Sequence, residues 1–216
     1  MLYIVSTPIG NLEDITLRAI RTLKEADLVV AEDTRHVQIL LKKYEIKTPV
    51  NSYHSYSSDS KVEYIVGLLK EDKNIALVSD AGTPGISDPA YTLIKRAIEE
   101  GIKICPIPGA SSLLAALVIS GKPMNHFKYL GFLPLKKGRQ TLLTELAKEE
   151  STIVIFESPH RLLRTLNDLK TYFGDREIAI CRELTKIFEE VLRMTITEAI
   201  THFTNKNPKG EFVIVI

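Results

Sequence analysis

Residues 75–90 constrain the fold of this chain more than any other stretch. The apolar run Ile75–Val78 is typical of a buried parallel strand. A loop with two glycines, two prolines and two aspartates follows, and apolar residues from Ala90 to Ile98 then recur at helical spacing. Ser87 or Asp88 is the expected N-cap, with Pro89 in the first turn. A strand, loop and helix in this order favour a ligand site at the carboxyl edge of an open sheet. An ordinary connection whose glycines serve only the backbone is the alternative.

The same loop lacks the two common phosphate-binding fingerprints. Neither G-x-G-x-x-G nor G-x-x-x-x-G-K-[ST] occurs anywhere in the chain. The loop is acidic and stiffened by proline, which suits a ligand with hydroxyls, amines or positive charge better than a bare polyphosphate. Dinucleotide and P-loop functions therefore lose their main support.

Strands and helices alternate through the first half, which predicts a parallel sheet covered on both faces. A helix from about Thr16 is expected to bury Leu17, Ile20 and Leu23. In the second half, Glu177–Met194 holds two strand-like runs with no helix-length crossover, so at least one antiparallel pair and a mixed sheet are expected. The overall prediction is an α/β protein of two α/β domains, residues 1–120 and 121–216, divided near Gly121.

Composition limits the classes of protein. The net charge of +1 over 216 residues gives no global field for nucleic acid, so any RNA contact must come from local patches. Cys105 and Cys181 lie in apolar runs and are expected to be buried thiols of a cytoplasmic protein, with no metal-binding spacing. The N-terminus has no basic region of a signal peptide, and the longest apolar stretch, residues 110–119, is too short to span a bilayer. No membrane association is expected.

Four loops of the first half come directly after expected strands: Thr7–Asn11, Glu32–His36, Asp80–Asp88 and Pro108–Ser112. The carboxyl ends of parallel strands share one edge, so these loops are expected to converge on one crevice. Singly, each has an ordinary structural explanation: a turn, a helix cap, or a surface ion pair of small value.

Two segments of the second half repeat this pattern. Phe156–Arg161 ends a buried strand and starts a helix, and Arg182–Lys186 follows the strand that contains Cys181. With Lys136, Lys137 and Arg139, the cations of these segments would form a basic rim suited to phosphates. A solvated surface is the alternative for at least half of them, and a helix dipole alone favours Glu157 where it lies.

The chain resembles the tetrapyrrole methylase-like family of S-adenosylmethionine-dependent methyltransferases. It is most similar to the branch that methylates the ribose 2′-hydroxyl of a cytidine in the decoding centre of small-subunit ribosomal RNA. The resemblance rests on six blocks that occur in order along the chain: Thr7–Leu12, Ala31–Arg35, Ser79–Pro89, Pro108–Ser111, Glu157–Arg161 and Arg182–Lys186. The tetrapyrrole-modifying branch shares the plan and a related glycine-proline loop, but lacks the Glu-Asp-Thr-Arg and Glu-Ser-Pro-His-Arg blocks.

This resemblance implies two α/β domains with S-adenosylmethionine in the cleft between them, a homodimer, and ribosomal RNA or a ribosomal subunit as partner. The first domain would carry much of the donor site, and the second would close the cleft and contribute to the acceptor site. The residues that the resemblance implies for the donor are Pro8, Asp80, Ala81, Gly82, Pro84, Ser87, Ser111, Ser112, Phe156, Glu157, Gly210 and Glu211. Family members usually continue beyond the strand that ends here at Ile216, which leaves the extent of the RNA surface open.

A ribose hydroxyl is a poor nucleophile and gains from a positioned base. Glu32, Asp33 and Glu183 are the candidate catalytic bases, and the sequence does not rank them. The candidate substrate-binding residues are Asn11, Arg35, Arg161, Arg182 and Lys186. Two other functions are kept as alternatives: a small-molecule methyltransferase of the tetrapyrrole type, and a non-catalytic α/β protein that binds a nucleotide or RNA.

Overall fold

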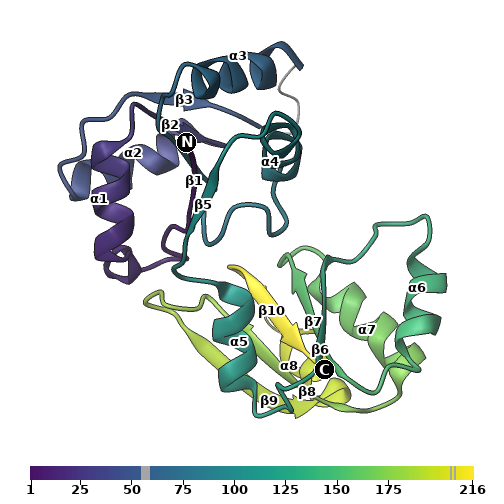
Figure 1. Cartoon of the computed structure of the whole chain (residues 1–216). Coiled ribbons are helices and arrows are strands. Elements are labelled where there is room, and N and C mark those ends of the chain that lie inside the picture. Colours follow the sequence, from purple (N-terminus) through teal and green to yellow (C-terminus); the bar gives the residue numbers. More distant parts are fainter. Residues whose placement is uncertain (55–58, 205, 207) are drawn as a thin grey trace. The chain divides into compact units, whose positions relative to one another are not determined.

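The computed structural model describes residues 1–54, 59–204, 206 and 208–216. The chain forms two compact units, Met1–Ser111 and Ser112–Ile216. Each unit is built on its own sheet (Figure 1). The division falls before the boundary expected near Gly121, because helix α5 (Ser112–Ser120) packs on strands of the second unit. The α/β class and the two-unit organisation agree with the sequence prediction. The division of donor and acceptor roles between the units stays a prediction.

The first unit alternates strands and helices along the chain. Its elements are β1 (Leu2–Val5), the 3-10 helix η1 (Leu12–Asp14), α1 (Leu17–Glu25), β2 (Leu28–Ala31), α2 (Thr34–Lys43), β3 (Val50–Ser52), α3 (Asp59–Lys70), β4 (Ile75–Val78), α4 (Ala90–Glu99) and β5 (Ile104–Ile107). The strands pair in the order β3-β2-β4-β1-β5, and every pair is parallel. This confirms the expected parallel sheet.

Alternate residues of these strands supply two cores, one on each face of the sheet. On one face Val5, Val29 and Ala76 pack against apolar side chains of α1 and α2. On the other face Leu2 and Ile75, among others, pack against α3 and α4. Figure 1 shows the two helix pairs on opposite sides of the strands. Both faces are covered, which explains why the strands are almost continuous apolar runs.

The predicted burial of Leu17 is wrong. Helix α1 starts after its N-cap Thr16 and buries Ala19, Thr22 and Leu23, whereas Leu17 is 86% exposed. Leu17 lies about 200° around the helix from Ala19, since each residue turns the chain by about 100°. Ile98 is similarly exposed on α4, although the sequence pattern placed it on the apolar face.

The cap of helix α4 differs in detail from the expectation. Pro89 occupies the N-cap position, but the carboxylate of Asp88 accepts hydrogen bonds from the N–H groups of Ala90, at 3.0 Å, and Gly85, at 2.8 Å. Asp88 therefore ties the loop to the helix from one residue further back.

The second unit contains α5, β6 (Phe127–Phe132), α6 (Arg139–Leu146), β7 (Thr152–Glu157), α7 (Leu162–Phe173), β8 (Glu177–Arg182), β9 (Glu190–Thr195), α8 (Ile196–Thr204) and β10 (Phe212–Val215). The strands pair in the order β6-β7-β10-β8-β9. β6 and β7 are parallel, whereas β10 is antiparallel to both β7 and β8, and β9 is antiparallel to β8. The predicted mixed sheet and the antiparallel pair within Glu177–Met194 are confirmed.

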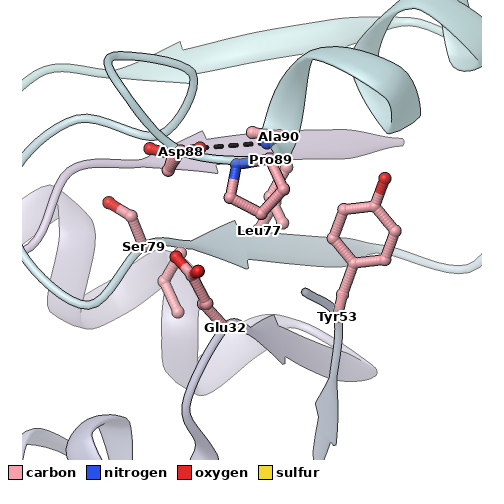
Figure 2. Close-up of a pocket in the computed structure, with 8 residues that line it drawn as sticks. Glu32, Tyr53, Leu77, Ser79, Asp88, Pro89 and Ala90 are labelled. Carbon is pink, nitrogen blue, oxygen red and sulfur yellow. Dashed lines mark hydrogen bonds between the residues drawn. The ribbon is translucent and has the colours of Figure 1, made fainter. Parts of the chain in front are cut away.

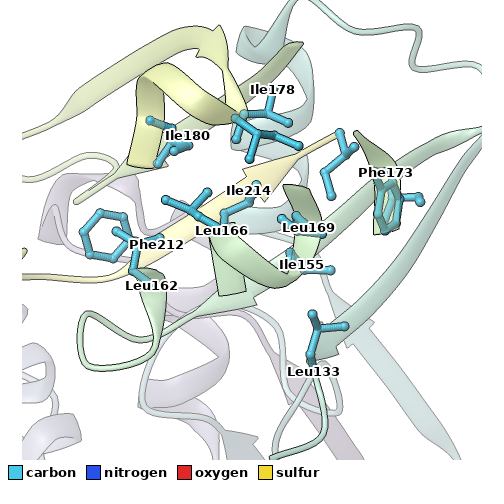
Figure 3. Packing of buried hydrophobic residues seen from close by; sticks show 14 of the residues in the cluster. Leu133, Ile155, Leu162, Leu166, Leu169, Phe173, Ile178, Ile180, Phe212 and Ile214 are labelled. Atoms are coloured by element: carbon cyan, nitrogen blue, oxygen red, sulfur yellow. The ribbon is translucent and has the colours of Figure 1, made fainter. Parts of the chain in front are cut away.

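Apolar side chains of α7 and α8 cover one face of this sheet (Figure 3). Leu162, Leu166 and Leu169 of α7 pack against Ile155, Ile180 and Ile214 of the central strands. The opposite face carries α5, where Cys181 is fully buried and its pKa is raised by burial to about 11. The predicted burial is therefore confirmed for Cys181, whereas Cys105 on β5 is only half-buried.

Candidate functional site

The loops at the carboxyl edge of the first sheet are linked to one another by hydrogen bonds. Thr7 and Gly82 form an antiparallel bridge that joins the loops after β1 and β4. The distance is 2.9 Å from Thr7 N to Gly82 O and 3.1 Å from Gly82 N to Thr7 O. Ser6 Oγ and Thr83 Oγ1 lie 2.9 Å apart in the same junction. The N–H of Asp33 donates to Asp80 Oδ1 at 3.0 Å, which joins the loop after β2.

The fourth loop, after β5, is also packed into this edge. Thr83 Oγ1 lies 3.5 Å from the carbonyl oxygen of Ala110, and a Cβ at Gly109 would come within 2.9 Å of Ser6 Cβ. The expected convergence of the four strand-end loops is therefore present within this unit, with the β4–α4 loop at its centre. Such an edge is the usual ligand-binding position of an open α/β sheet.

The β4–α4 loop has a backbone shape that ordinary sequences avoid. Gly82, Gly85 and Ser87 have φ values of +78°, +92° and +67°. Glycine adopts such values without strain, whereas Ser87 does not. Asp80, Ala81 and Ser87 are exposed on this loop, while Pro8, Gly82 and Pro84 are buried. The structure therefore divides the predicted donor residues of the first unit into an accessible set and a set that shapes the loop.

A small cavity of about 10 Å³, the scale of one water molecule, lies beneath this loop (Figure 2). Glu32 from the end of β2, Tyr53 from the end of β3, and Ser79 and Asp88 line it. The Glu32 carboxylate extends toward the β4–α4 loop in Figure 2. Burial raises the pKa of Glu32, and the nearby carboxylates of Asp80 and Asp88 raise it further. Glu32 thus binds a proton more readily than an ordinary glutamate.

Asp33, the neighbouring candidate base, is in the opposite electrostatic state. Its carboxylate receives hydrogen bonds from Arg35 Nη2, at 2.6 Å, and from Arg35 Nε, at 3.0 Å. These bonds and the Arg35 N–H hold the pKa of Asp33 well below its usual range. Asp33 also caps helix α2. It is a structural acid, and Arg35 remains exposed beside it.

The corresponding edge of the second sheet brings together the ends of β7 and β8 and the start of β10. Phe212 pairs with Glu157 on one side and with Arg182 on the other. Three segments from distant parts of the sequence therefore lie along one edge of this unit. They contain the predicted site residues Phe156, Glu157, Arg161, Arg182, Glu183, Lys186, Gly210 and Glu211.

Glu157 is buried, and both of its carboxylate oxygens have partners within the unit. Oε1 accepts from the N–H of Ser158 at 2.8 Å and lies 3.3 Å from Arg161 Nε, while Oε2 accepts from Thr165 Oγ1 at 2.5 Å. Arg161 Nη2 in turn donates to the carbonyl oxygen of Leu133 at 2.5 Å. Glu157 and Arg161 therefore hold this strand end together, and the donor contacts expected of Phe156 and Glu157 stay predictions.

Glu183 and Lys186 form a second closed cluster. Lys186 Nζ donates to Glu183 Oε1 at 2.9 Å and to Glu211 Oε2 at 3.0 Å, and the N–H of Glu211 donates to Glu183 Oε1 at 2.9 Å. Burial raises the pKa of Glu183, but the bonds from Lys186 and Glu211 outweigh it, so the net shift is downward. Burial likewise lowers the pKa of Lys186, and its two carboxylate partners reverse the shift.

Gly210 packs closely against this cluster. Its φ is +96°, and a Cβ there would lie 2.5 Å from Glu183 Cγ and 2.6 Å from Glu183 Cδ. Arg182 is also occupied, because its Nε donates to the carbonyl oxygen of Lys209 at 2.6 Å. The charged residues at this edge of the second sheet thus form hydrogen bonds and ion pairs with one another and with the neighbouring backbone.

The sequence interpretation missed one buried polar network. Arg139, expected on a basic rim, is buried: its Nε pairs with Asp168 at 2.7 Å, its Nη2 donates to Thr165 Oγ1 at 2.8 Å, and its Nη1 to the carbonyl oxygen of Pro134 at 3.0 Å. The signal was present, since Arg139 precedes the buried Leu143 and Leu146 at helical spacing on α6. Lys136 and Lys137, by contrast, are exposed as expected.

The remaining predicted residues lie at element ends. Asn11 is the N-cap of η1 and accepts from the N–H of Glu13 at 3.1 Å. Ser111 ends the first unit and Ser112 begins α5. Phe156 meets Tyr129 and Phe132 edge to face, at centroid distances of 5.1 and 5.9 Å. In the described part of the chain, no group of three or more His, Cys, Asp or Glu side chains is arranged to hold a metal ion.

These features define an α/β protein whose strand-end loops meet at one edge of a parallel sheet, and comparison with known proteins gives the family. The chain belongs to the family described as Tetrapyrrole (Corrin/Porphyrin) Methylases, whose pattern it matches over residues 1–200. Among solved structures, it is similar to a uroporphyrin-III C-methyl transferase from Thermus thermophilus in complex with S-adenyl homocysteine. The TM-score is 0.69 at 19% identity, over 99% of this chain and 96% of that one. At this identity the likeness shows the shared fold.

Two curated relatives are much closer in sequence, and both are named Ribosomal RNA small subunit methyltransferase I. The protein from Thermotoga maritima is 51% identical over 100% of this chain and 97% of its own length. The protein from Synechocystis sp. is 50% identical over 100% of this chain and 78% of its own length. Separately, none of the helices described here has the length and apolar character needed to cross a membrane.

Proposed function

We propose that this chain transfers a methyl group from S-adenosylmethionine to the ribose 2′-hydroxyl of a cytidine in the decoding region of small-subunit ribosomal RNA. The observation that carries the proposal is the similarity along the whole chain, at 43–51% identity, to relatives that are all named Ribosomal RNA small subunit methyltransferase I. The linked loops of the first sheet edge support it, because they offer accessible polar groups to a small donor.

S-adenosylmethionine would supply the methyl group as a sulfonium. The accessible part of the β4–α4 loop fits its polar groups: Asp80 offers a carboxylate to hydroxyls or an amine, and Ala81 and Ser87 are exposed beside it on the same loop. A carboxylate held against a sulfonium would favour the ground state, whose charge is lost during transfer. We therefore expect Asp80 to hold ribose hydroxyls or the amino group.

Glu32 is the general base that the electrostatics favour. Of the three candidates, Glu32 alone has a raised pKa, through burial and through Asp80 and Asp88, whereas the pKa values of Asp33 and Glu183 are lowered. A base works best when its pKa approaches the working pH. Glu32 would accept the proton that the 2′-hydroxyl loses as its oxygen attacks the methyl group.

The cations predicted to bind substrate differ in how free they are. Arg35 is 89% exposed and keeps donors available beside Asp33, so we propose that it contacts the acceptor RNA. Asn11 is also exposed, and we propose the same role for it from the family resemblance alone. Arg161, Arg182 and Lys186 have internal partners, so we propose that they act on RNA mainly by fixing the loops that carry them.

Two further properties follow from the proposed function. We propose that the protein acts in the cytoplasm, with RNA or assembled subunits as substrate, and that it is a homodimer. Light scattering of the purified protein checks the second point. A mass near twice 24.2 kDa supports a dimer, and a mass near 24.2 kDa contradicts it.

Methyl-transfer assays with purified protein and labelled S-adenosylmethionine test the function. The acceptors are small ribosomal subunits, naked small-subunit RNA and a uroporphyrinogen-type tetrapyrrole. Label incorporated into RNA as alkali-resistant 2′-O-methylcytidine is the expected result. Incorporation into the tetrapyrrole alone would assign the chain to the small-molecule branch. Donor binding by calorimetry without transfer to any acceptor would favour a non-catalytic binding protein.

A further inference from the structure

The two helix layers of the first unit carry very different charge. Helices α1 and α2, which cover one face of the sheet, contain six Lys and Arg residues and a single Glu. Helices α3 and α4, on the other face, contain four Lys and Arg residues against three Asp and Glu. The net charge of the whole chain is only +1, so this excess on one layer is local.

The two layers also differ in how their cations are paired. On α3 and α4, Lys70 pairs with Glu100, Lys95 with Glu99, and Arg96 with Glu63 and Glu100. On α1 and α2, Arg35 is paired with Asp33, whereas Arg18, Arg21, Lys24, Lys42 and Lys43 have no ion pair among the described residues. All five are exposed. We call these five residues together with Arg35 the α1–α2 basic face.

The α1–α2 basic face adjoins the candidate site through the chain itself. Helix α2 starts two residues after Glu32, and α1 follows the loop that contains Pro8 and Asn11. Arg18 and Arg21 are one turn apart on α1, and Arg35 is two turns from Lys42 on α2, so each helix presents a row of positive charge. Both rows point away from the sheet, since Leu23, Leu40 and Leu41 face the core.

We propose that the α1–α2 basic face binds the phosphate backbone of the ribosomal RNA that flanks the methylated nucleotide. This inference rests on the proposed function, which supplies RNA as the acceptor. Exposed cations without an ion pair can bind phosphates without first breaking a bond to a carboxylate. Their binding releases counterions from the RNA, which favours association. The balanced α3–α4 layer has no such capacity, because most of its cations already have carboxylate partners. RNA recognition of this kind positions the substrate without reading its sequence.

A pair of charge-matched variants tests the proposal in the full chain. The face variant carries Arg18→Gln, Arg21→Gln and Lys42→Gln, and the control carries Lys103→Gln, Lys148→Gln and Lys170→Gln. The three control lysines are exposed and without an ion pair among the described residues. Both variants lose the same net charge, and thermal melts check that both remain folded. The probe is a transcript of small-subunit ribosomal RNA, titrated at several salt concentrations.

The face variant is expected to bind the transcript at least about tenfold more weakly and to lower the slope of log affinity against log salt by about 2. Donor affinity measured by calorimetry should be unchanged in both variants, and the control should match the unmodified protein. Equal slopes for the face variant and the unmodified protein, or equal losses in both variants, would overturn the proposal.

Vesicle binding and methyl transfer, both measured on the unmodified protein, complete the test. Binding to vesicles of equal phosphatidylserine and phosphatidylcholine, without binding to the transcript, would mean that the face serves an anionic membrane and would overturn the proposal.

Methyl transfer to small subunits is measured in parallel. If transfer is intact and the salt slope does not change, the face proposal fails while the proposed function stands. If transfer is absent, the proposed function itself fails.

Discussion

The two sheet edges of this protein contain similar residues in opposite states. In the first unit, Glu32 faces Asp80 and Asp88, and its pKa is raised. In the second unit, Glu157 and Glu183 are surrounded by donors, and Lys186 and Arg161 are their cationic partners. A carboxylate without a cationic partner can have a raised pKa and is then able to accept a proton in a reaction. A carboxylate that is paired with a cation has a lower pKa and mainly stabilises the local structure. The contrast teaches where the charges are used: those of the second edge hold its loops together, whereas Glu32 of the first edge forms no ion pair among the described residues, and we therefore propose the first edge as the place of the chemistry.

The difference between the edges predicts that Glu32→Gln damages catalysis and not folding. The rate of transfer should fall by about 10²- to 10⁴-fold, because the amide cannot accept the hydroxyl proton. Donor affinity should change little. The matched control is Glu25→Gln on the outer side of α1, which should retain full activity. A Glu32→Gln enzyme with an unaltered kcat would show that the base lies elsewhere.

The pH dependence of the same enzyme sharpens this prediction. A general base acts when it is deprotonated, so the rate should fall as the pH drops through the pKa of Glu32. Because that pKa is raised, the fall should begin at a higher pH than an ordinary glutamate would cause. The acidic limb of the profile should disappear in Glu32→Gln, and its persistence would assign that limb to another group.

In the second unit the largest effect should come from the buried cation. Arg139→Met leaves the Asp168 carboxylate without its cationic partner and removes the donor to Thr165 Oγ1, which keeps its bond to Glu157. We expect the free energy of unfolding to fall by about 3 kcal/mol. The exposed neighbour Lys137 provides the control, since Lys137→Met should stay within about 0.5 kcal/mol. Urea denaturation of the two variants measures both values. Equal stability of the two would mean that the Arg139 network contributes nothing.

A smaller loss is expected where Gly210 meets Glu183. Gly210→Ala combines an unfavourable positive φ with a collision against the Glu183 side chain, and should cost about 2 kcal/mol. Gly101→Ala has a φ of +67° and nothing within 4 Å of its new Cβ, so it measures the backbone strain alone. The difference between the two variants isolates the collision. No difference would mean that Glu183 moves aside freely.

The smallest expected effect is on donor binding. Asp80→Ala should weaken S-adenosylmethionine affinity by about tenfold, because it removes both a polar contact and the acceptor for the Asp33 N–H. Asp80→Asn keeps an acceptor oxygen and should lose less. Calorimetry with Glu71→Ala as the exposed-acid control gives the comparison. Unchanged affinity in Asp80→Ala would remove the β4–α4 loop from the donor site.

The strands and the two sheet types followed from the sequence because apolar runs and their spacing carry that information. The convergence of the four loops also followed, since parallel strands share one edge. What could not be read was the partner of each charge. Glu183, Lys186 and Glu211 meet only because β10 inserts between β7 and β8, a pairing that no local pattern records. The burial of Arg139 was missed because a charged residue is expected at the surface, although its helical spacing to Leu143 and Leu146 places it on the apolar side of α6.

The central claim is that this chain methylates a ribose in the decoding region of small-subunit ribosomal RNA. The most direct measurement maps 2′-O-methylation across that RNA from cells with and without the gene for this protein. We predict that one cytidine in the decoding region loses its ribose methyl group without the gene and regains it when the gene is restored. An identical methylation map in both cell types would contradict the claim.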